Sequence, residues 1–256
     1  MNGSGPTSDP RYRKILGISF FGGRASEAIA SIRSGGLLVV PAAPALKDVD
    51  RDVAYRDALL GADLVITDSA LMVLVWNLIQ RDSLYRLSGL EYLRELLREP
   101  DIRQTGNTLW IMASPKSAQT NLKWLADEGI AVTPECVYMA PMYGAEIADE
   151  KLLELIERLH PQHVIVTVGG GTQERLGLYL KQKLNYLPAI HCIGAAIAFL
   201  SGDQVKIPVW GDRFYLGWLL RCLSEPKRYL PRYWGARKLI GLMLRYRDRQ
   251  PDLRSA

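Results

Sequence analysis

Cysteine is scarce in this sequence, and its three copies are not arranged for pairing. Cys136, Cys192 and Cys222 are odd in number and widely spaced, and none of them forms a Cys-x-x-Cys pair. The chain therefore encodes neither a disulfide framework nor a zinc knuckle. This cysteine usage fits a reducing compartment.

Long hydrophobic runs are also missing. The longest are residues 70–76 and residues 187–200, the second interrupted by His191, and both are too short to span a bilayer. The N-terminus has no basic flank followed by an apolar stretch, so we expect no secretory signal. A transmembrane protein is not expected either.

Several familiar catalytic motifs are absent. The chain has no Gly-Lys-Ser/Thr of a P-loop, no G-x-G-x-x-G of dinucleotide folds and no G-x-S-x-G elbow of serine hydrolases. His160 and His163 flank Pro161 in an expected loop, and His191 lies in an apolar strand, so we expect core or surface histidines and no metal site. No cofactor is implied.

Short β-branched runs alternate with amphipathic helical stretches in this chain, which has 256 residues and is 48% hydrophobic. Expected strands are residues 15–21, 37–42, 62–68, 108–114, 131–140, 163–171 and 189–195, and expected helices are 25–34, 53–60, 92–98, 118–128, 149–160 and 173–183. This rhythm predicts an α/β domain over residues 11–202, with a mostly parallel, Rossmann-like sheet and helices on both faces.

Positive charge is concentrated at the end of the chain. From residue 203 onward there are 12 Lys and Arg against 5 Asp and Glu, within a total net charge of +5. Residues 203–247 also carry Trp, Tyr and Pro on helical spacing, so we predict a basic, aromatic, helical appendage there. Residues 1–10 and 248–256 are expected to be disordered. Such a segment indicates a phosphate-rich partner, which could be nucleic acid, anionic lipid or a diphosphate.

Several expected strands end in small residues followed by a helix start, notably at residues 20–28 and 168–174. Ligands of such sheets bind beyond the carboxyl ends of the strands, so these turns are the first candidate sites. Gly169 and Gly170 begin a turn that opens a helix, where backbone N–H groups could face an anion; a plain tight turn is the alternative. Asp68 ends the strand 62–68, where a carboxylate suits a general base. Capping the following helix is an equally natural role for it.

Asp48 and Asp50 match the D-x-D pattern with which many glycosyltransferases hold a metal and a diphosphate. The pattern is short, and it lies beside Arg51, Asp52 and a helical stretch. A solvated capping cluster is therefore the better interpretation.

Larger segments are more specific. Residues 164–180 resemble a strand with a glycine turn and a Gln-Glu pair, and residues 192–210 resemble a strand followed by Ala-Pro-x-Trp. Residues 213–233 resemble the signature Gly-Leu-Glu-Trp-Leu-x-Arg-Leu with Glu-Pro-Arg-Arg and Arg-Tyr. Residues 61–76 and 86–93 resemble the upstream Asp-Gly and Arg-x-Ser/Thr-Gly segments. Together they resemble the WecG/TagA/CpsF family (glycosyltransferase family 26) from about Ile15 to Tyr246.

The resemblance implies an inverting, metal-independent transfer of a hexose or N-acetylhexosamine from a UDP-sugar to a polyprenyl-diphosphate-linked sugar. It implies that Asp68 deprotonates the acceptor hydroxyl, with Arg86 and Glu91 supporting the site. The implied donor-binding residues are Gly169, Gly170, Gln173, Glu174, Arg213, Arg221 and Arg228. Arginines suit the diphosphate because their guanidinium groups form bidentate hydrogen bonds.

The sequence departs from the family pattern at several positions. Pro41, Ala42 and Ala43 replace the family's Thr-x-Asn, and Ser69, Gly171 and Ala198 replace Gly, Pro and Asp. A pocket without the amide-binding Asn favours a plain hexose donor. Whether the loss at Pro41 and Ala43 impairs activity is not decided by the sequence, nor are the acceptor sugar and the linkage.

The resemblance further implies a cytoplasmic protein that is peripheral on the inner face of the cell membrane, where the appendage meets anionic lipid, and it suggests a homo-oligomer. The competing hypothesis is a catalytically inactive scaffold in a polysaccharide assembly complex. Nucleic acid is not expected as a partner, since no DNA- or RNA-binding motif is present.

Overall fold

The computed structural model describes residues 9–144, 146–204 and 206–253. Its centre is one eight-stranded sheet with the order β1-β2-β4-β3-β8-β7-β5-β6. The strands are β1 (Tyr12–Ile15), β2 (Ile18–Phe21), β3 (Gly36–Val39), β4 (Leu64–Ile66), β5 (Thr108–Met112), β6 (Val137–Met139), β7 (His163–Val166) and β8 (Ala189–Cys192). Strand β1 pairs antiparallel with β2, and the other pairs are parallel. The predicted α/β fold with a mostly parallel sheet is confirmed.

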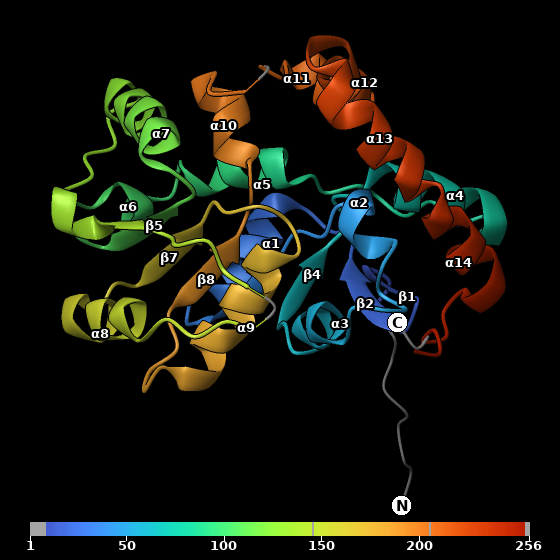
Figure 1. Ribbon diagram of the computed structural model, residues 1–256, viewed down its shortest axis with the longest axis horizontal. Helices are drawn as coiled ribbons and strands as arrows, with labels where there is room; N and C mark the ends of the chain where they lie inside the picture. The colour runs from blue at the N-terminus through green and yellow to red at the C-terminus, as the bar shows by residue number, and fades with distance from the viewer. Residues whose placement is uncertain (1–8, 145, 205, 254–256) are drawn as a thin grey trace, which may run out of the picture.

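Helices cover both faces of this sheet (Figure 1). The face that holds Leu37 and Val39 is covered by α2 (Ala43–Leu46), α3 (Val53–Leu60), α4 (Ala70–Gln80), α8 (Glu150–Leu159), α9 (Thr172–Lys183) and α14 (Lys238–Tyr246). The face that holds Leu38 and Val40 is covered by α1 (Ala25–Ile32), α5 (Gly89–Leu96), α6 (Pro100–Arg103), α7 (Pro115–Asp127) and α10 (Ala196–Ser201). Successive residues of β3 thus enter opposite cores, because side chains alternate across a strand.

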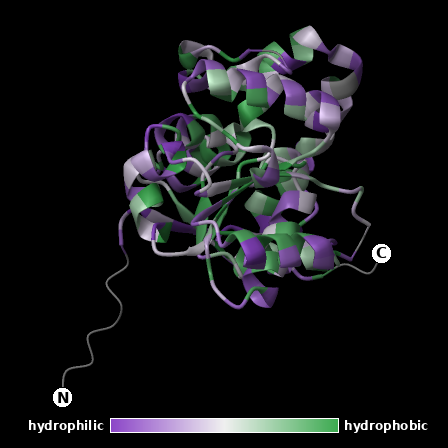
Figure 2. Cartoon of the chain, turned by 90° about the vertical axis from the view of Figure 1, so that its left-hand side faces the viewer, coloured by the Kyte–Doolittle hydropathy of each residue, from purple (hydrophilic) through white to green (hydrophobic). Residues whose placement is uncertain are grey.

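The predicted helical appendage is present after residue 202. It consists of α11 (Val209–Arg213), α12 (Gly217–Ser224) and α13 (Pro226–Ala236), which lie above the sheet, while α14 continues down its side (Figure 1). Figure 2 shows that hydrophobic residues dominate the central strands, whereas the surrounding helices mix hydrophobic and hydrophilic residues. Across the described residues, no helix combines the length and apolar character needed to cross a bilayer.

The first predicted strand is wrong, because residues 15–21 are not one strand: they contain the end of β1, a turn and β2, which together belong to a hairpin. Leu16 and Gly17 both have positive φ, of 52° and 81°, which is the geometry of a two-residue type I′ turn. Gly17 is packed against Gln250, whose Cβ would lie 2.7 Å from a Cβ at this glycine. A bulkier residue does not fit there.

Two other predicted segments also differ. The expected strand 131–140 contains a 3-10 turn, Pro134–Cys136, before the short strand β6. Residues 248–253, for which disorder was expected, contact the hairpin: the N–H of Gly17 donates to the carbonyl of Asp248 (3.0 Å), and Pro251 is buried.

Candidate functional site

Asp68 lies just beyond β4, at the carboxyl edge of the sheet. Its Oδ1 accepts a hydrogen bond from the N–H of Gly89 (2.9 Å), the first residue of α5, and its side chain is 23% exposed. The helix-cap interpretation of Asp68 is wrong, since Ser69 caps α4 by accepting from the N–H of Met72 (3.2 Å). The Asp68 carboxylate therefore has no part in capping α4 and instead accepts from the first N–H of α5.

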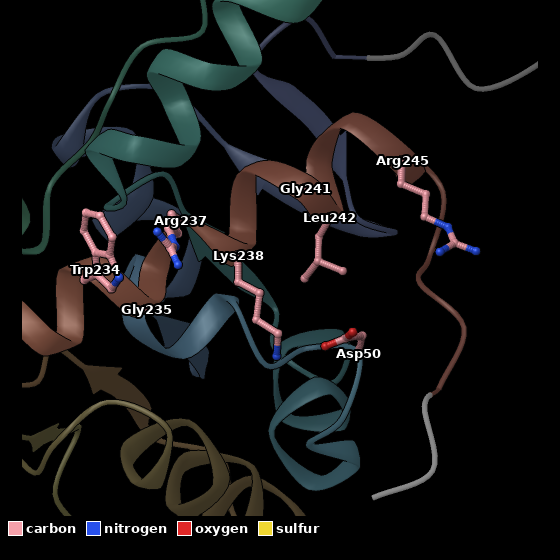
Figure 3. A pocket seen from close by; sticks show the side chains of 8 residues that line it. All are labelled: Asp50, Trp234, Gly235, Arg237, Lys238, Gly241, Leu242 and Arg245. Carbon is pink, nitrogen blue, oxygen red and sulfur yellow. The ribbon is translucent and has the colours of Figure 1, made fainter.

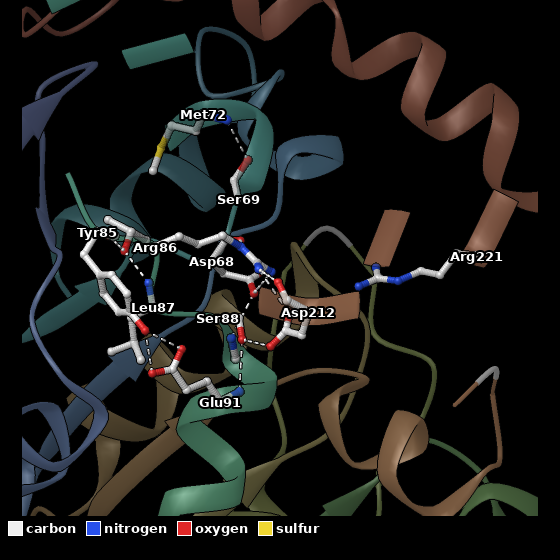
Figure 4. Close-up of polar contacts among 12 residues, drawn as sticks. Asp68, Ser69, Met72, Tyr85, Arg86, Leu87, Ser88, Glu91, Asp212 and Arg221 are labelled. Atoms are coloured by element: carbon white, nitrogen blue, oxygen red, sulfur yellow. Dashed lines mark hydrogen bonds and ion pairs between the residues drawn. The ribbon is translucent and has the colours of Figure 1, made fainter. Parts of the chain in front are cut away.

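Arg86 ties Asp68 to the appendage (Figure 4). Its Nε donates to the main-chain carbonyl of Asp68 (2.7 Å), and its Nη1 donates to Oδ1 of Asp212 (3.0 Å) on α11. The other carboxylate oxygen of Asp212 accepts from Ser88 Oγ, and Ser88 Oγ accepts from the N–H of Glu91 (3.0 Å) as the N-cap of α5. Strand end, helix start and appendage thus meet in one network.

The basicity of Asp68 reflects opposing effects. Burial raises the pKa of its carboxyl group, while the charges of Arg86 and Arg221 and the Gly89 hydrogen bond lower that pKa. A carboxylate with a raised pKa is a better proton acceptor, so this balance suits a general base.

Glu91 and Tyr85 border a cavity next to this network. Tyr85 Oη donates to both carboxylate oxygens of Glu91 (2.9 and 3.0 Å), and burial raises the pKa of Glu91. The cavity has a volume of about 660 Å³ and is lined further by Glu95 and by residues 22–27, at the carboxyl end of β2. Since β2 pairs with β4, a ligand-sized space opens one strand away from Asp68.

The glycine turn lies three strands away, after β7. Gly169 and Gly170 are exposed, and Gly171 has a φ of 89°. The N–H of Gly171 already donates to Oε2 of Glu174 (2.6 Å), which closes the start of α9. The exposed backbone at Gly169 and Gly170 is the part of this turn that a ligand can reach.

The Gln-Glu pair is not at the surface. Gln173 is 2% and Glu174 0% exposed, and Gln173 Nε2 donates to Glu174 Oε1 (3.0 Å). Burial raises the pKa of Glu174 to about 7. In this conformation Glu174 holds the glycine turn by accepting from the Gly171 N–H. Contact of the Gln173 or Glu174 side chain with a UDP-sugar stays a prediction.

The predicted arginines are placed differently from one another. Arg221 on α12 donates to Tyr233 Oη (3.0 Å), its guanidinium lies 4.4 Å from the ring centre of Phe199, and it points toward Asp212 (Figure 4). Arg213 is exposed at the end of α11. The side chain of Arg228 lies outside the part of the chain that the structure describes.

Asp50 corrects the interpretation of the D-x-D pattern. Asp52 caps α3 by accepting from the N–H of Tyr55 (2.9 Å), as a capping cluster requires, but Asp50 is fully buried and not solvated. It lies at a second cavity of about 580 Å³, which is also lined by Trp234 of α13 and by Lys238 and further residues of α14 (Figure 3). Of the predicted site residues whose side chains the structure describes, none lines this cavity.

The histidines are core and surface residues. His163, expected in a loop, begins β7 and is buried; its Nδ1 lies 3.0 Å from Nε2 of His191, whose Nδ1 lies 2.7 Å from Tyr92 Oη. His160 stacks on Tyr186. Within the described ranges, no three His, Cys, Asp or Glu side chains gather as a metal site.

Sequence reasoning missed two residues of the network. Ser88 belongs to the segment 86–93, whose resemblance pointed to this place but not to its role. Asp212 gave no signal, because it is 126 positions from Arg86 and lies in a segment that reads only as part of a basic appendage.

Comparisons with known proteins agree with the resemblance found in the sequence. A family model described as Glycosyl transferase WecG/TagA/CpsF family matches residues 13–252. A protein of Bacillus spizizenii (strain ATCC 23059 / NRRL B-14472 / W23), an N-acetylglucosaminyldiphosphoundecaprenol N-acetyl-beta-D-mannosaminyltransferase, is 24% identical over 77% of each chain.

Proposed function

Because this chain belongs to the WecG/TagA/CpsF family of glycosyltransferases, we propose that it transfers a hexose from a UDP-sugar to a sugar linked to a polyprenyl diphosphate. The observation that carries the proposal is Asp68, a partly exposed carboxylate at the carboxyl edge of the sheet with two guanidinium groups near it. The similar Bacillus protein, by its name, acts on a diphosphoundecaprenol-linked sugar, which supports a lipid-linked acceptor here.

In the proposed reaction, the acceptor hydroxyl attacks the anomeric carbon of the donor sugar and Asp68 takes the hydroxyl proton. The bond from the anomeric carbon to the diphosphate oxygen breaks, and UDP leaves with that electron pair. Attack opposite the leaving group inverts the anomeric centre. Arg221 reaches the site from the appendage and is the candidate to stabilise the charge on the departing diphosphate.

The preference for a plain hexose rests on the end of β3. Pro41 and Ala43 are buried there and carry no polar side-chain group, so neither can bind an N-acetyl group by a side-chain hydrogen bond. We therefore expect UDP-glucose or a similar hexose donor to outcompete UDP-N-acetylmannosamine. A preference for the N-acetylated donor in direct competition would refute this point.

The appendage is proposed to lie on the membrane surface. Its exposed side chains include Trp210, Phe214, Trp218, Leu223, Leu230 and Trp234. A helical surface that mixes such aromatics with Lys and Arg matches the interface of an anionic bilayer. This placement would bring Asp68 to the level at which a lipid-linked acceptor presents its sugar.

The test is release of UDP by the purified protein from a panel of UDP-sugars with a lipid-diphosphate-sugar acceptor, in EDTA. Asp68→Asn should abolish acceptor-dependent release, whereas the control Asp127→Asn, at an exposed carboxylate of α7, should not. The product should carry the inverted anomeric configuration by NMR. If no donor gives release with any of several acceptors, the scaffold hypothesis replaces the enzyme.

A further inference from the structure

The carboxylate of Asp212 joins the appendage to the residues around Asp68. Asp212 is 7% exposed and receives hydrogen bonds from Arg86 Nη1 on one oxygen and from Ser88 Oγ on the other, while its main-chain carbonyl accepts a second bond from Arg86 Nη1 (2.9 Å). Both donors belong to the α/β domain, and Asp212 belongs to α11. The site is therefore complete only when α11 is docked.

Arg86 is shared unequally between two carboxylates. Its Nη1 is 3.0 Å from Asp212 Oδ1, whereas its Nη2 is 3.9 Å from Asp68 Oδ1. The guanidinium is only 11% exposed, so solvent screens its charge little. A carboxylate at hydrogen-bond distance compensates this charge more strongly than one at 3.9 Å.

The charged and titratable groups around Asp68 come from several elements. Arg86 precedes α5, Arg221 lies on α12 and Tyr233 on α13, and Asp212 lies on α11. Among these, Asp212 alone adds negative charge, and its effect on the pKa of Asp68 is upward. Without the Asp212 charge, Asp68 would be the carboxylate that compensates the Arg86 charge.

We propose that Asp212 is a positioning residue: by holding Arg86, it keeps Asp68 from becoming the main ion-pair partner of that arginine and so keeps Asp68 a competent base. This inference rests on the proposed function only for the role of Asp68 as base. Asp212 does not contact the reacting atoms. It makes the chemistry depend on the docking of α11, whose neighbouring Trp210 and Phe214 are exposed on the appendage surface.

The direct test titrates the Asp68 carboxyl by ¹³C NMR in full-length protein labelled at aspartate, with the signal assigned from Asp68→Asn. In Asp212→Asn the pKa of Asp68 should fall by about one pH unit, and Asp212→Glu should restore most of it. The matched control is Asp203→Asn, because Asp203 accepts a hydrogen bond from Ser117 on α7, at another junction of the appendage. An unchanged or raised pKa in Asp212→Asn, or an equal fall in the control, would overturn the proposal.

A second variant keeps the test valid if Asp212→Asn fails to fold. Asp212→Ser also removes the carboxylate but keeps a small polar side chain beside Ser88, so the pKa of Asp68 should fall in this variant as well. No fall would overturn the proposal in the same way.

Kinetics then separate this inference from the proposed function. If the wild-type protein releases UDP, the acidic limb of its kcat/KM pH profile should shift to lower pH in Asp212→Asn, by the same amount as the pKa of Asp68 measured by NMR. If the NMR shift appears but wild-type protein releases no UDP, the proposed function fails while the link from Asp212 to Asp68 stands.

Discussion

Gly89 is the position where a single added methyl group should test the geometry around Asp68, the proposed base. Its N–H donates to Asp68 Oδ1 at 2.9 Å. A Cβ added at Gly89 would lie 2.7 Å from Val40 Cγ1 at the end of β3, and 3.7 Å from Asp68 Oδ1. Alanine is acceptable at this helical position for the backbone, so the effect of Gly89→Ala is steric.

The expected magnitude follows from that overlap. Ordinary contact begins at 3.4 Å, so α5 and the end of β3 must separate by 0.7 Å or one side chain must turn. Overpacking of this kind costs about 1–3 kcal/mol of unfolding free energy, and the better helix propensity of Ala returns less than about 1 kcal/mol. Because the movement displaces the donor that orients Asp68, we expect kcat to fall about ten- to a hundredfold.

The compensating change is Val40→Ala, which removes the clashing Cγ1 and leaves the Val40 Cβ at 3.7 Å. Alone it should cost about 2 kcal/mol for the lost methyl groups and the space they leave. Combined with Gly89→Ala, the total loss should be smaller than the sum by about 1 kcal/mol or more, and kcat should recover in part.

Urea unfolding and the UDP-release assay measure the two effects. Gly241→Ala is the matched control, since no heavy atom of the described chain lies within 4 Å of a Cβ added there in α14. It should leave kcat unchanged and raise stability by about 0.5–1 kcal/mol. Strictly additive free energies for Gly89→Ala and Val40→Ala, or full activity in Gly89→Ala, would refute the assigned contact.

Three further outcomes are expected. Burial raises the pKa of Glu174 from 4.5 to about 7, so between these pH values the folded chain keeps a proton that the unfolded chain loses. The free energy of unfolding should therefore decrease as the pH rises from 4.5 to about 7. Urea titrations at several pH values should show this decrease, and Glu174→Gln should remove it. Burial lowers the pKa of His163 and of His191, so a separate loss of stability should appear as the pH drops below 6.5, and His191→Gln should flatten it; an unchanged slope would contradict the buried pair. Trp218→Ser, at a 46% exposed position of the appendage, should weaken sedimentation with anionic vesicles about tenfold, while Leu78→Ser on α4 should not.

Much of the fold followed from local patterns. Buried parallel strands are short continuous apolar runs between helices, and such runs marked β3, β4, β5, β7 and β8. Asp68 could be picked from the sequence because a polar residue directly after such a run lies at the edge of the sheet where ligands bind.

The errors arose where geometry overrides pattern. A run of apolar residues does not show that Leu16 and Gly17 both take positive φ, so the hairpin looked like one strand. Adjacent Asp68 and Ser69 are both good capping residues, and only the path of the chain into α4 makes Ser69 the cap. The polar character of Asp50 suggested exposure, whereas the packing of α14 buries it.

The sequence by itself determined the alternation of strands and helices, the basic helical appendage and the resemblance that identified the family. Tertiary structure decided which carboxylate Arg86 holds, that Glu174 turns inward under the glycine turn, and that Asp212 completes the network from 126 positions away. Hydrophobic period and capping act over a few residues and are therefore written in the local sequence. Charge pairing acts through space, and the partners become neighbours only when the chain folds.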